Sequence, residues 1–302
     1  MDNQNQKEHI DVYAMVTNRI IELLAQGTIP WQQPWTTSGQ PRNLITKRPY
    51  KGVNILLLNS LSFEHNLFLT FKQIKTIGGS VIKGEKGQFI VFTKMVDDKD
   101  DPSKKRYFLR FYKVFNVSQC TGLPIEFLPT ENSICEKVSS FEVVAENMPN
   151  PPKITVGGKE AFYSPSEDRV NMPAIKSFKK AEAYYSVLFH ELVHSTGHQS
   201  RLNRKEVTEK IVFGSQQYSL EELVAEIGSC YLKSYTGIFE SEIINSVSYI
   251  QHWLEKLKND KKFIIHAASR AQRAVEYILD EKQTESQNTD YENQPELEEE
   301  SF

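Results

Sequence analysis

The sequence predicts an α+β protein with two domains, and three observations support this prediction. First, 302 residues suffice for two domains of ordinary size, each able to bury its own core. Second, strand-like segments occur in both halves, whereas long helical patterns dominate the back half. Third, residues 1–137 carry 18 Lys and Arg against 13 Asp and Glu, while residues 138–302 carry 18 against 26. The front half is therefore suited to a polyanionic partner, and the back half is not.

Composition places the domain boundaries and excludes several protein classes. We expect one domain at 1–137, a proline-containing linker at 138–152, a second domain at 153–280 and a disordered acidic tail at 281–302. No run of about 18 apolar residues exists, so we expect no membrane partner. The polar N-terminus lacks a signal-peptide core, which predicts a cytoplasmic protein. The sequence indicates no oligomeric state.

The first predicted element is an amphipathic helix over residues 8–27, closed by Gly27. A proline-rich loop with Trp31 and Trp35 follows. A tryptophan in such a loop either fills a core or offers a surface on which a base stacks. The sequence leaves both readings open.

Residues 42–113 are basic, with aromatic residues interleaved. Segments 87–95 and 107–117 have strand-like patterns, and the polar residues between them predict a hairpin loop. Cations that follow a phosphate backbone, together with rings that stack on unpaired bases, are typical of single-strand binding. The alternative is a sheet with an aromatic core and a lysine-rich wet face. Gly78–Gly87 lacks the phosphate-loop order, so nucleotide hydrolysis is not supported.

The strongest chemical motif lies in the back half. Residues 151–173 read as strands joined by tight turns, and they precede a predicted helix at Ala181–His198. In that helix His190 and His194 lie one turn apart on one face, which suits Zn²⁺, and Glu191 beside them can accept a proton from water. The opposite face is apolar through Tyr185, Leu188 and Leu192.

A second helix, near residues 218–235, places Glu222 and Glu226 four residues apart on one face. Either carboxylate can supply a third zinc ligand, with the other orienting a histidine. A competing explanation is local, because Ser219 to Glu222 matches a capping box. Residues 246–280 predict two more packing helices, broken near Asn259 and Asp260.

From about residue 9 to 280 the chain resembles the ArdC-type antirestriction proteins, whose N-terminal region is similar to the single-strand-binding part of plasmid TraC primases. The resemblance rests on VYAMVTNRIIELLAQGTIPWQQPW, PRNLITKRPYKGVNILLL, TFKQIKTIGGSVIKGEKG and FYKVFNVSQCTGLP, and then on YYSVLFHELVHSTGHQSRLNR, EELVAEIGSCYL and AASRAQRAVEYI. It implies an N-terminal domain that binds single-stranded DNA and a C-terminal zincin-like metallopeptidase domain. It also implies a role on conjugative plasmids and other mobile elements, where such proteins protect incoming DNA from restriction.

The resemblance assigns roles to residues of this chain. It implies that His190 and His194 are zinc ligands, that Glu191 is the general base, and that Glu222 is the third ligand. It also implies that Glu226 orients a ligand histidine without binding the metal itself. Ser200 stands where longer zincin motifs have a third histidine. The residues that we expect at the single-stranded DNA are Trp31, Trp35, Arg42, Asn43, Arg48, Tyr50, Lys51, Lys72, Lys83 and Lys86.

Two functions stay open at this point. In the first, the zinc site is an active peptidase centre that acts on an unknown protein substrate. In the second, the chain is a DNA-shielding protein or a primase accessory whose zinc is structural or idle.

Overall fold

The structure is a computed structural model, and it describes residues 10–32, 39–97, 105–124, 141–209, 212, 214–237 and 246–281. The helices are α1 (Val12–Ala25), α2 (Val53–Asn59), α3 (Phe71–Thr76), α4 (Phe141–Glu146), α5 (Ala181–Ser195), α6 (Lys205–Thr208), α7 (Gln216–Thr236), α8 (Val247–Asn259) and α9 (Phe263–Ile278). The strands are β1 (Arg42–Asn43), β2 (Leu67–Thr70), β3 (Ser80–Val81), β4 (Gln88–Asp97), β5 (Lys105–Asn116), β6 (Cys120–Thr121), β7 (Lys153–Val156), β8 (Phe162–Ser164) and β9 (Arg169–Met172). Helices and sheets are thus both present, as the α+β prediction required.

The N-terminal sheet has the strand order β1-β2-β5-β4. Its long antiparallel pair, β4 with β5, confirms the two strands expected from the interleaved pattern. The Asn54 side chain joins α2 to this sheet, because it donates to Val91 O and accepts from Val91 N. A second, short pair joins β3 to β6. The sheet and its two short helices therefore form one packed unit.

The C-terminal part contains a three-stranded sheet of order β7-β9-β8. Here β7 runs parallel to β9, and β8 runs antiparallel to it. Val170 and Met172 on the central strand are fully buried, in the same core cluster as α5 residues such as Phe189. The predicted strand and turn unit is thus confirmed, and it covers one side of α5.

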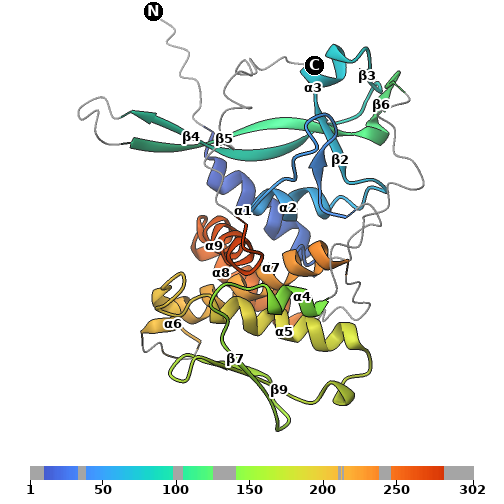
Figure 1. Ribbon diagram of the computed structural model, residues 1–302. Coiled ribbons are helices and arrows are strands. Elements are labelled where there is room, and N and C mark those ends of the chain that lie inside the picture. The colour runs from blue at the N-terminus through green and yellow to red at the C-terminus, as the bar shows by residue number, and fades with distance from the viewer. Residues whose placement is uncertain are drawn as a thin grey trace, which may run out of the picture.

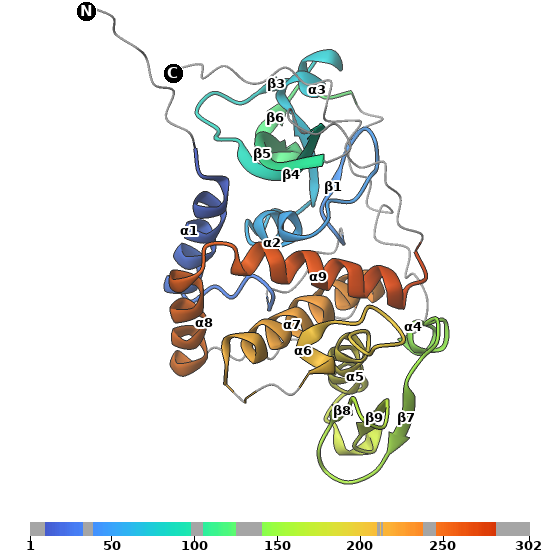
Figure 2. The same cartoon turned by 90° about the vertical axis from the view of Figure 1, so that its left-hand side faces the viewer.

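The elements stack in layers, with the N-terminal sheet at one end and the small sheet at the other (Figure 1). Figure 2 shows α9 lying between α2 on one side and α7 on the other, with α1 stacked over α8. One continuous hydrophobic core reaches from α1 and α2 to α5, α7 and α9. This arrangement differs from the expected pair of separate cores, because α1 and α2 bury their apolar faces against the C-terminal helices.

Polar contacts reinforce this junction. Tyr231 on α7 donates a 2.7 Å hydrogen bond from its hydroxyl to Gly52 O, and Lys51 forms a 2.7 Å ion pair with Glu276 on α9.

The segment expected as a linker contains α4, and Val144 and Met148 in that region are buried in the shared core. None of the helices in the described part of the chain has the length and apolar character needed to cross a bilayer.

Candidate functional site

Helices α5 and α7 pack closely, and this packing brings the candidate metal ligands together. A Cβ atom added at Gly228 on α7 would lie 2.7 Å from a Val193 methyl group on α5, so glycine is needed at this crossing. Ser229 on α7 donates a 3.0 Å hydrogen bond to Ser186 O on α5. As predicted, the back of α5 is buried, which leaves its histidine face toward α7.

His190, His194 and Glu222 offer three donor atoms at one place. The two histidine Nε2 atoms lie 3.1 Å apart. Glu222 Oε2 lies 3.7 Å from the Nε2 atom of His190, and Glu222 Oε1 lies 3.7 Å from that of His194. A tetrahedral ion with bonds of about 2.0–2.1 Å separates its ligand atoms by about 3.3 Å. The observed spacing fits such an ion, so these three residues can hold a divalent metal.

The donor set is open on one side. The side chains of His190 and Glu222 are 26% and 32% exposed. Three protein ligands with a solvent-facing fourth position are typical of catalytic zinc sites, whereas structural sites are closed by four protein ligands. Among the residues that the structure describes, these three are the His, Cys, Asp and Glu side chains that come together as such a group.

The capping-box explanation for Glu222 is excluded by the start of α7. The helix begins at Gln216, and Ser215 is its N-cap, accepting a hydrogen bond from Tyr218 N. Ser219 therefore lies inside the helix, where its hydroxyl donates to Ser215 O. Burial alone would raise the pKa of the Glu222 carboxyl, but hydrogen bonding with His190 holds that pKa below its usual value.

Glu221 occupies the supporting position that the resemblance gave to Glu226. Its Oε1 atom lies 3.1 Å from His194 Nδ1, the ring nitrogen that faces away from the metal donors. Such a contact fixes the tautomer and the orientation of a ligating histidine. Glu226 instead accepts a 2.7 Å hydrogen bond from the Tyr249 hydroxyl on α8. The role expected of Glu226 is thus corrected, and the responsible carboxylate is Glu221.

A buried arginine completes this support. Arg204 Nε and Nη2 donate to the two oxygens of Glu221 at 2.8 and 2.6 Å. The same guanidinium donates to Thr196 Oγ1 at 2.6 Å and to Val193 O at 2.8 Å, which ties it to the end of α5. Gly197 makes room for this loop, because a Cβ there would lie 2.4 Å from a Val207 methyl. The arginine therefore links α5, α7 and the loop after His198.

Charge interactions set the ionisation of Glu221 and His194. Burial alone would raise the pKa of Glu221, but the neighbouring Arg204 guanidinium holds it below the usual value. Burial alone would lower the pKa of His194, yet hydrogen bonding to Glu221 raises it. Glu221 is therefore an anion at neutral pH, which favours a proton on His194 Nδ1 and leaves Nε2 for a metal.

Glu191 and Tyr218 border the donor set. Glu191 is buried, and its carboxylate acts electrostatically on both His194 and Tyr218. The Tyr218 hydroxyl is hydrogen-bonded to the Glu222 carboxylate. The pKa of Tyr218 is raised, mainly because the side chain is partly buried and also because the Glu222 anion lies beside it. Sequence reasoning missed Tyr218, although it lies one helical turn before Glu222.

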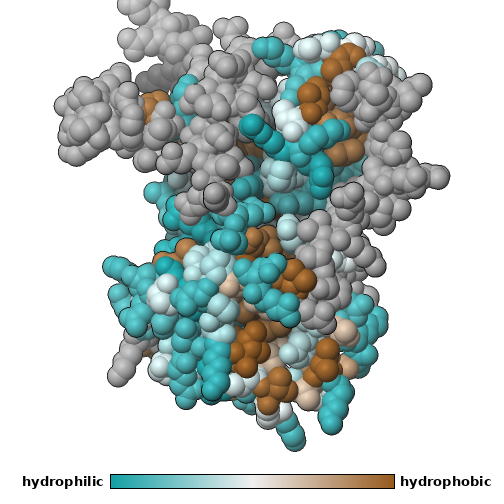
Figure 3. Space-filling view, viewed as in Figure 1, coloured by the Kyte–Doolittle hydropathy of each residue, from teal (hydrophilic) through white to brown (hydrophobic). Residues whose placement is uncertain are grey.

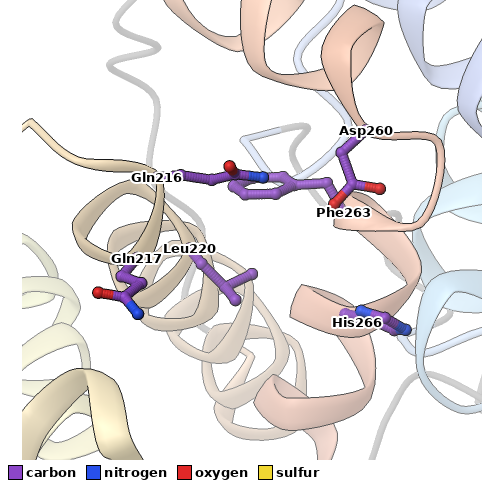
Figure 4. Close-up of a pocket in the computed structure, with 6 residues that line it drawn as sticks. All are labelled: Gln216, Gln217, Leu220, Asp260, Phe263 and His266. Carbon is purple, nitrogen blue, oxygen red and sulfur yellow. The ribbon is translucent and has the colours of Figure 1, made fainter.

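A shallow pocket of about 190 Å³ lies away from these donors. It is lined by Gln216, Gln217, Leu220, Asp260, Phe263 and His266. Figure 4 shows these side chains extending from the start of α7 and from the α8–α9 junction, without a cluster of polar groups converging on one point. We therefore assign the candidate chemistry to the open donor set and not to this pocket.

The residues expected at single-stranded DNA divide into two groups. Arg48, Lys72, Lys83 and Lys86 are exposed, as a DNA contact requires. Trp31 is only 1% exposed; its ring packs edge-on against Trp253, and its Nε1 donates to the Tyr249 hydroxyl.

Four further residues expected at the DNA are buried, half-buried or paired within the protein. Tyr50 packs in a core with Phe68, and Asn43 is buried and bonded to Gln73. Lys51 is engaged by Glu276, and Arg42 is half-buried. Trp31, Asn43 and Tyr50 are thus structural residues, while Trp35 lies outside the described residues.

Known proteins resemble this chain over nearly all of its length. Residues 10–117 match the family described as the N-terminal domain of anti-restriction factor ArdC, and residues 146–270 match the family described as zincin-like metallopeptidase. Protein y4eC of Sinorhizobium fredii, itself uncharacterized, is 32% identical and covers 89% of this chain and 91% of its own length. DNA primase TraC of Escherichia coli is 33% identical over 92% of this chain, which spans only 28% of the primase.

Solved structures agree with these matches. The metal-free crystal structure of antirestriction protein ArdC from plasmid R388 has a TM-score of 0.73 and 32% identity, and covers 90% of this chain and 98% of that chain. A Mn(II)-bound structure of the same protein has a TM-score of 0.73 and 31% identity, with the same coverage. The resemblance seen in the sequence is thereby confirmed: the chain belongs to the ArdC family of antirestriction proteins.

Proposed function

We propose that this chain protects the incoming DNA of a mobile element from restriction, by binding single-stranded DNA and by carrying Zn²⁺ in a peptidase-type site. The observation that carries the zinc site is the meeting of His190, His194 and Glu222 at tetrahedral spacing with one open side. The family relationship and the plasmid origin of the ArdC relative support the antirestriction role. The Mn(II)-bound form of that relative supports a divalent ion in this class of site.

The proposed chemistry is hydrolysis of a peptide bond in a protein substrate. A bound Zn²⁺ supplies Lewis-acid polarisation of the substrate carbonyl and of the attacking water. Glu191 accepts the proton of that water and then delivers it to the leaving amine. Glu221 and Arg204 hold the His194 ring in place, so that its Nε2 atom stays directed at the donor set.

The variant Glu191→Gln tests whether this site cuts a protein during antirestriction. The amide keeps the shape of the side chain but accepts no proton, so zinc content should stay at the wild-type level while proteolysis falls by about 100-fold or more. Protection of transferred DNA should fall with it, measured as conjugation or transformation efficiency into a restricting host. Full protection by Glu191→Gln would contradict the peptidase proposal and favour DNA shielding with an idle zinc site.

Single-stranded DNA binding should depend strongly on salt, because exposed lysines release counterions from the phosphates. The logarithm of the affinity should fall linearly with the logarithm of the salt concentration, with a slope of about −0.7 for each phosphate neutralised. Fluorescence anisotropy of a labelled oligothymidylate at several salt concentrations measures this slope. An affinity that does not change with salt would contradict the basic-surface proposal.

A further inference from the structure

One end of the N-terminal sheet carries an exposed aromatic ring among lysines. Phe71, the first residue of α3, is 47% exposed, and Ile82, directly after β3, is 43% exposed. Figure 3 shows a hydrophobic patch over the α3–β3 end of the sheet, bordered by hydrophilic residues. A half-exposed ring offers a flat apolar face to a partner.

Three chain segments meet at this place through Phe115 on β5. The Phe71 ring lies 6.4 Å from the Phe115 ring, centroid to centroid. On another side, a Cβ added at Gly87 would lie 2.9 Å from Phe115 Cζ and 3.1 Å from Lys113 Cβ. The loop before β4 therefore lies directly against Phe115, and a side chain at position 87 would require this ring to move.

The same loop is held in a fixed shape that presents its lysines. Gly84 adopts a positive φ of 93°, which glycine accommodates without strain, and Glu85 N donates to Ile82 O. Gln119 Nε2 donates to Glu85 Oε2 at 2.7 Å and to Lys86 O at 3.1 Å. The Glu85 carboxylate of this loop thus accepts a hydrogen bond from the neutral side-chain amide of Gln119. The exposed lysines on these segments are Lys72, Lys75, Lys83, Lys86 and Lys113.

These features fit one partner chemistry. These five exposed lysines outnumber the single loop carboxylate, Glu85, so the surface favours a polyanion. The Phe71 ring among the lysines favours a polyanion with unpaired bases that can stack on it. Lys75 Nζ lies over the Phe71 ring, 5.5 Å from its centroid. A base that stacks on this ring gains more than an exposed cation–π contact provides, and the displaced ammonium can then pair with a phosphate of the same strand.

We infer that Phe71 is the stacking ring of the single-stranded DNA site, with the surrounding lysines as its phosphate contacts. The inference rests on the proposed DNA-binding function and narrows it to a surface formed by α3, the β3–β4 loop and the Lys113–Phe115 end of β5. It replaces the aromatic contacts expected from the sequence at Trp31 and Tyr50, whose rings are buried.

The test compares two exposed rings in the full-length chain. Phe71→Ala should weaken binding of a labelled 20-residue oligothymidylate by about 10-fold, whereas Phe71→Trp should bind as the wild type does. Phe108→Ala is the matched control, because Phe108 on β5 is 43% exposed and lies outside this surface; it should change affinity by less than about twofold. Thermal melting of each variant checks that the fold is intact.

Salt dependence separates stacking from charge. Phe71→Ala should keep the wild-type salt slope, because all the lysines are still present, whereas Lys86→Ala should reduce the slope by about 0.7. Equal affinities of folded Phe71→Ala and the wild type would overturn the inference while leaving DNA binding intact. A larger loss in Phe108→Ala would also overturn it. Absence of binding by the wild type would instead overturn the proposed DNA-binding function.

Discussion

Replacing Glu222 with Gln should lower the affinity for Zn²⁺ by at least about 100-fold, exceeding the 10–100-fold typical of a lost outer partner. The reason is geometric: Glu222 is the donor that closes the set begun by the two histidines of α5. Without its carboxylate, two imidazoles alone hold the ion, and the neutral amide is a poor zinc ligand. Competition with a chromophoric chelator, on protein first stripped of metal, measures this loss.

Glu226→Gln is the matched control, because it makes the same glutamate-to-glutamine change one helical turn further along α7. Glu226 is bonded to Tyr249 and not to a ligand histidine, so its loss should change Zn²⁺ affinity by less than about threefold. The two variants also separate the alternatives that the sequence left open for these glutamates. A large loss in Glu226→Gln with a small one in Glu222→Gln would refute the assigned donor set.

The sequence predicted the helices and the histidine pair because both follow from local periodicity. The break between α8 and α9, and the approach of His190 to His194, depend on residues close together in the chain. Spacing on a single helix offered Glu222 or Glu226 as the third donor, and the family resemblance chose Glu222. These predictions needed no knowledge of which helices cross.

The supporting carboxylate was missed because it depends on that crossing. Spacing places Glu222 and Glu226 on one face, but the close contact at Gly228 turns the neighbouring position, Glu221, toward His194. Arg204 is distant from both in sequence and reads as part of a basic loop. Only the packed structure shows that its charge is buried against Glu221.

Burial of the aromatic residues was likewise invisible in composition. Trp31 lies in a proline-rich loop that suits a stacking ring as well as a core plug. Its environment is set by α8, more than 200 residues later, through Trp253 and Tyr249. The Tyr249 hydroxyl in turn donates to Glu226 on α7, the helix that carries Glu222. Trp31 and Tyr249 therefore connect the N-terminal segment to the metal-site helix.

Removing the guanidinium of Arg204 should cost more stability than any surface change. Arg204→Ala leaves the Glu221 anion buried without its partner, and breaking a buried pair in this way costs about 3–5 kcal/mol. Urea denaturation of the metal-free protein, followed by circular dichroism, measures the loss without a contribution from metal binding. A cost below about 1 kcal/mol would show that water solvates Glu221, and would contradict a buried ion pair.

A double variant and the pH dependence identify the charge as the cause. Arg204→Met with Glu221→Met removes both charges, so it should recover most of the stability lost in Arg204→Ala. The folded-state pKa of Glu221 is held below its usual 4.5, so this pair stabilises the fold above that pH and loses its effect as pH falls toward the folded value. Glu221→Gln should therefore lose less stability than the wild type between pH 5 and pH 3. If both proteins lose the same amount, the link that we draw from Arg204 through Glu221 to His194 carries no charge interaction, and the arginine acts through packing alone.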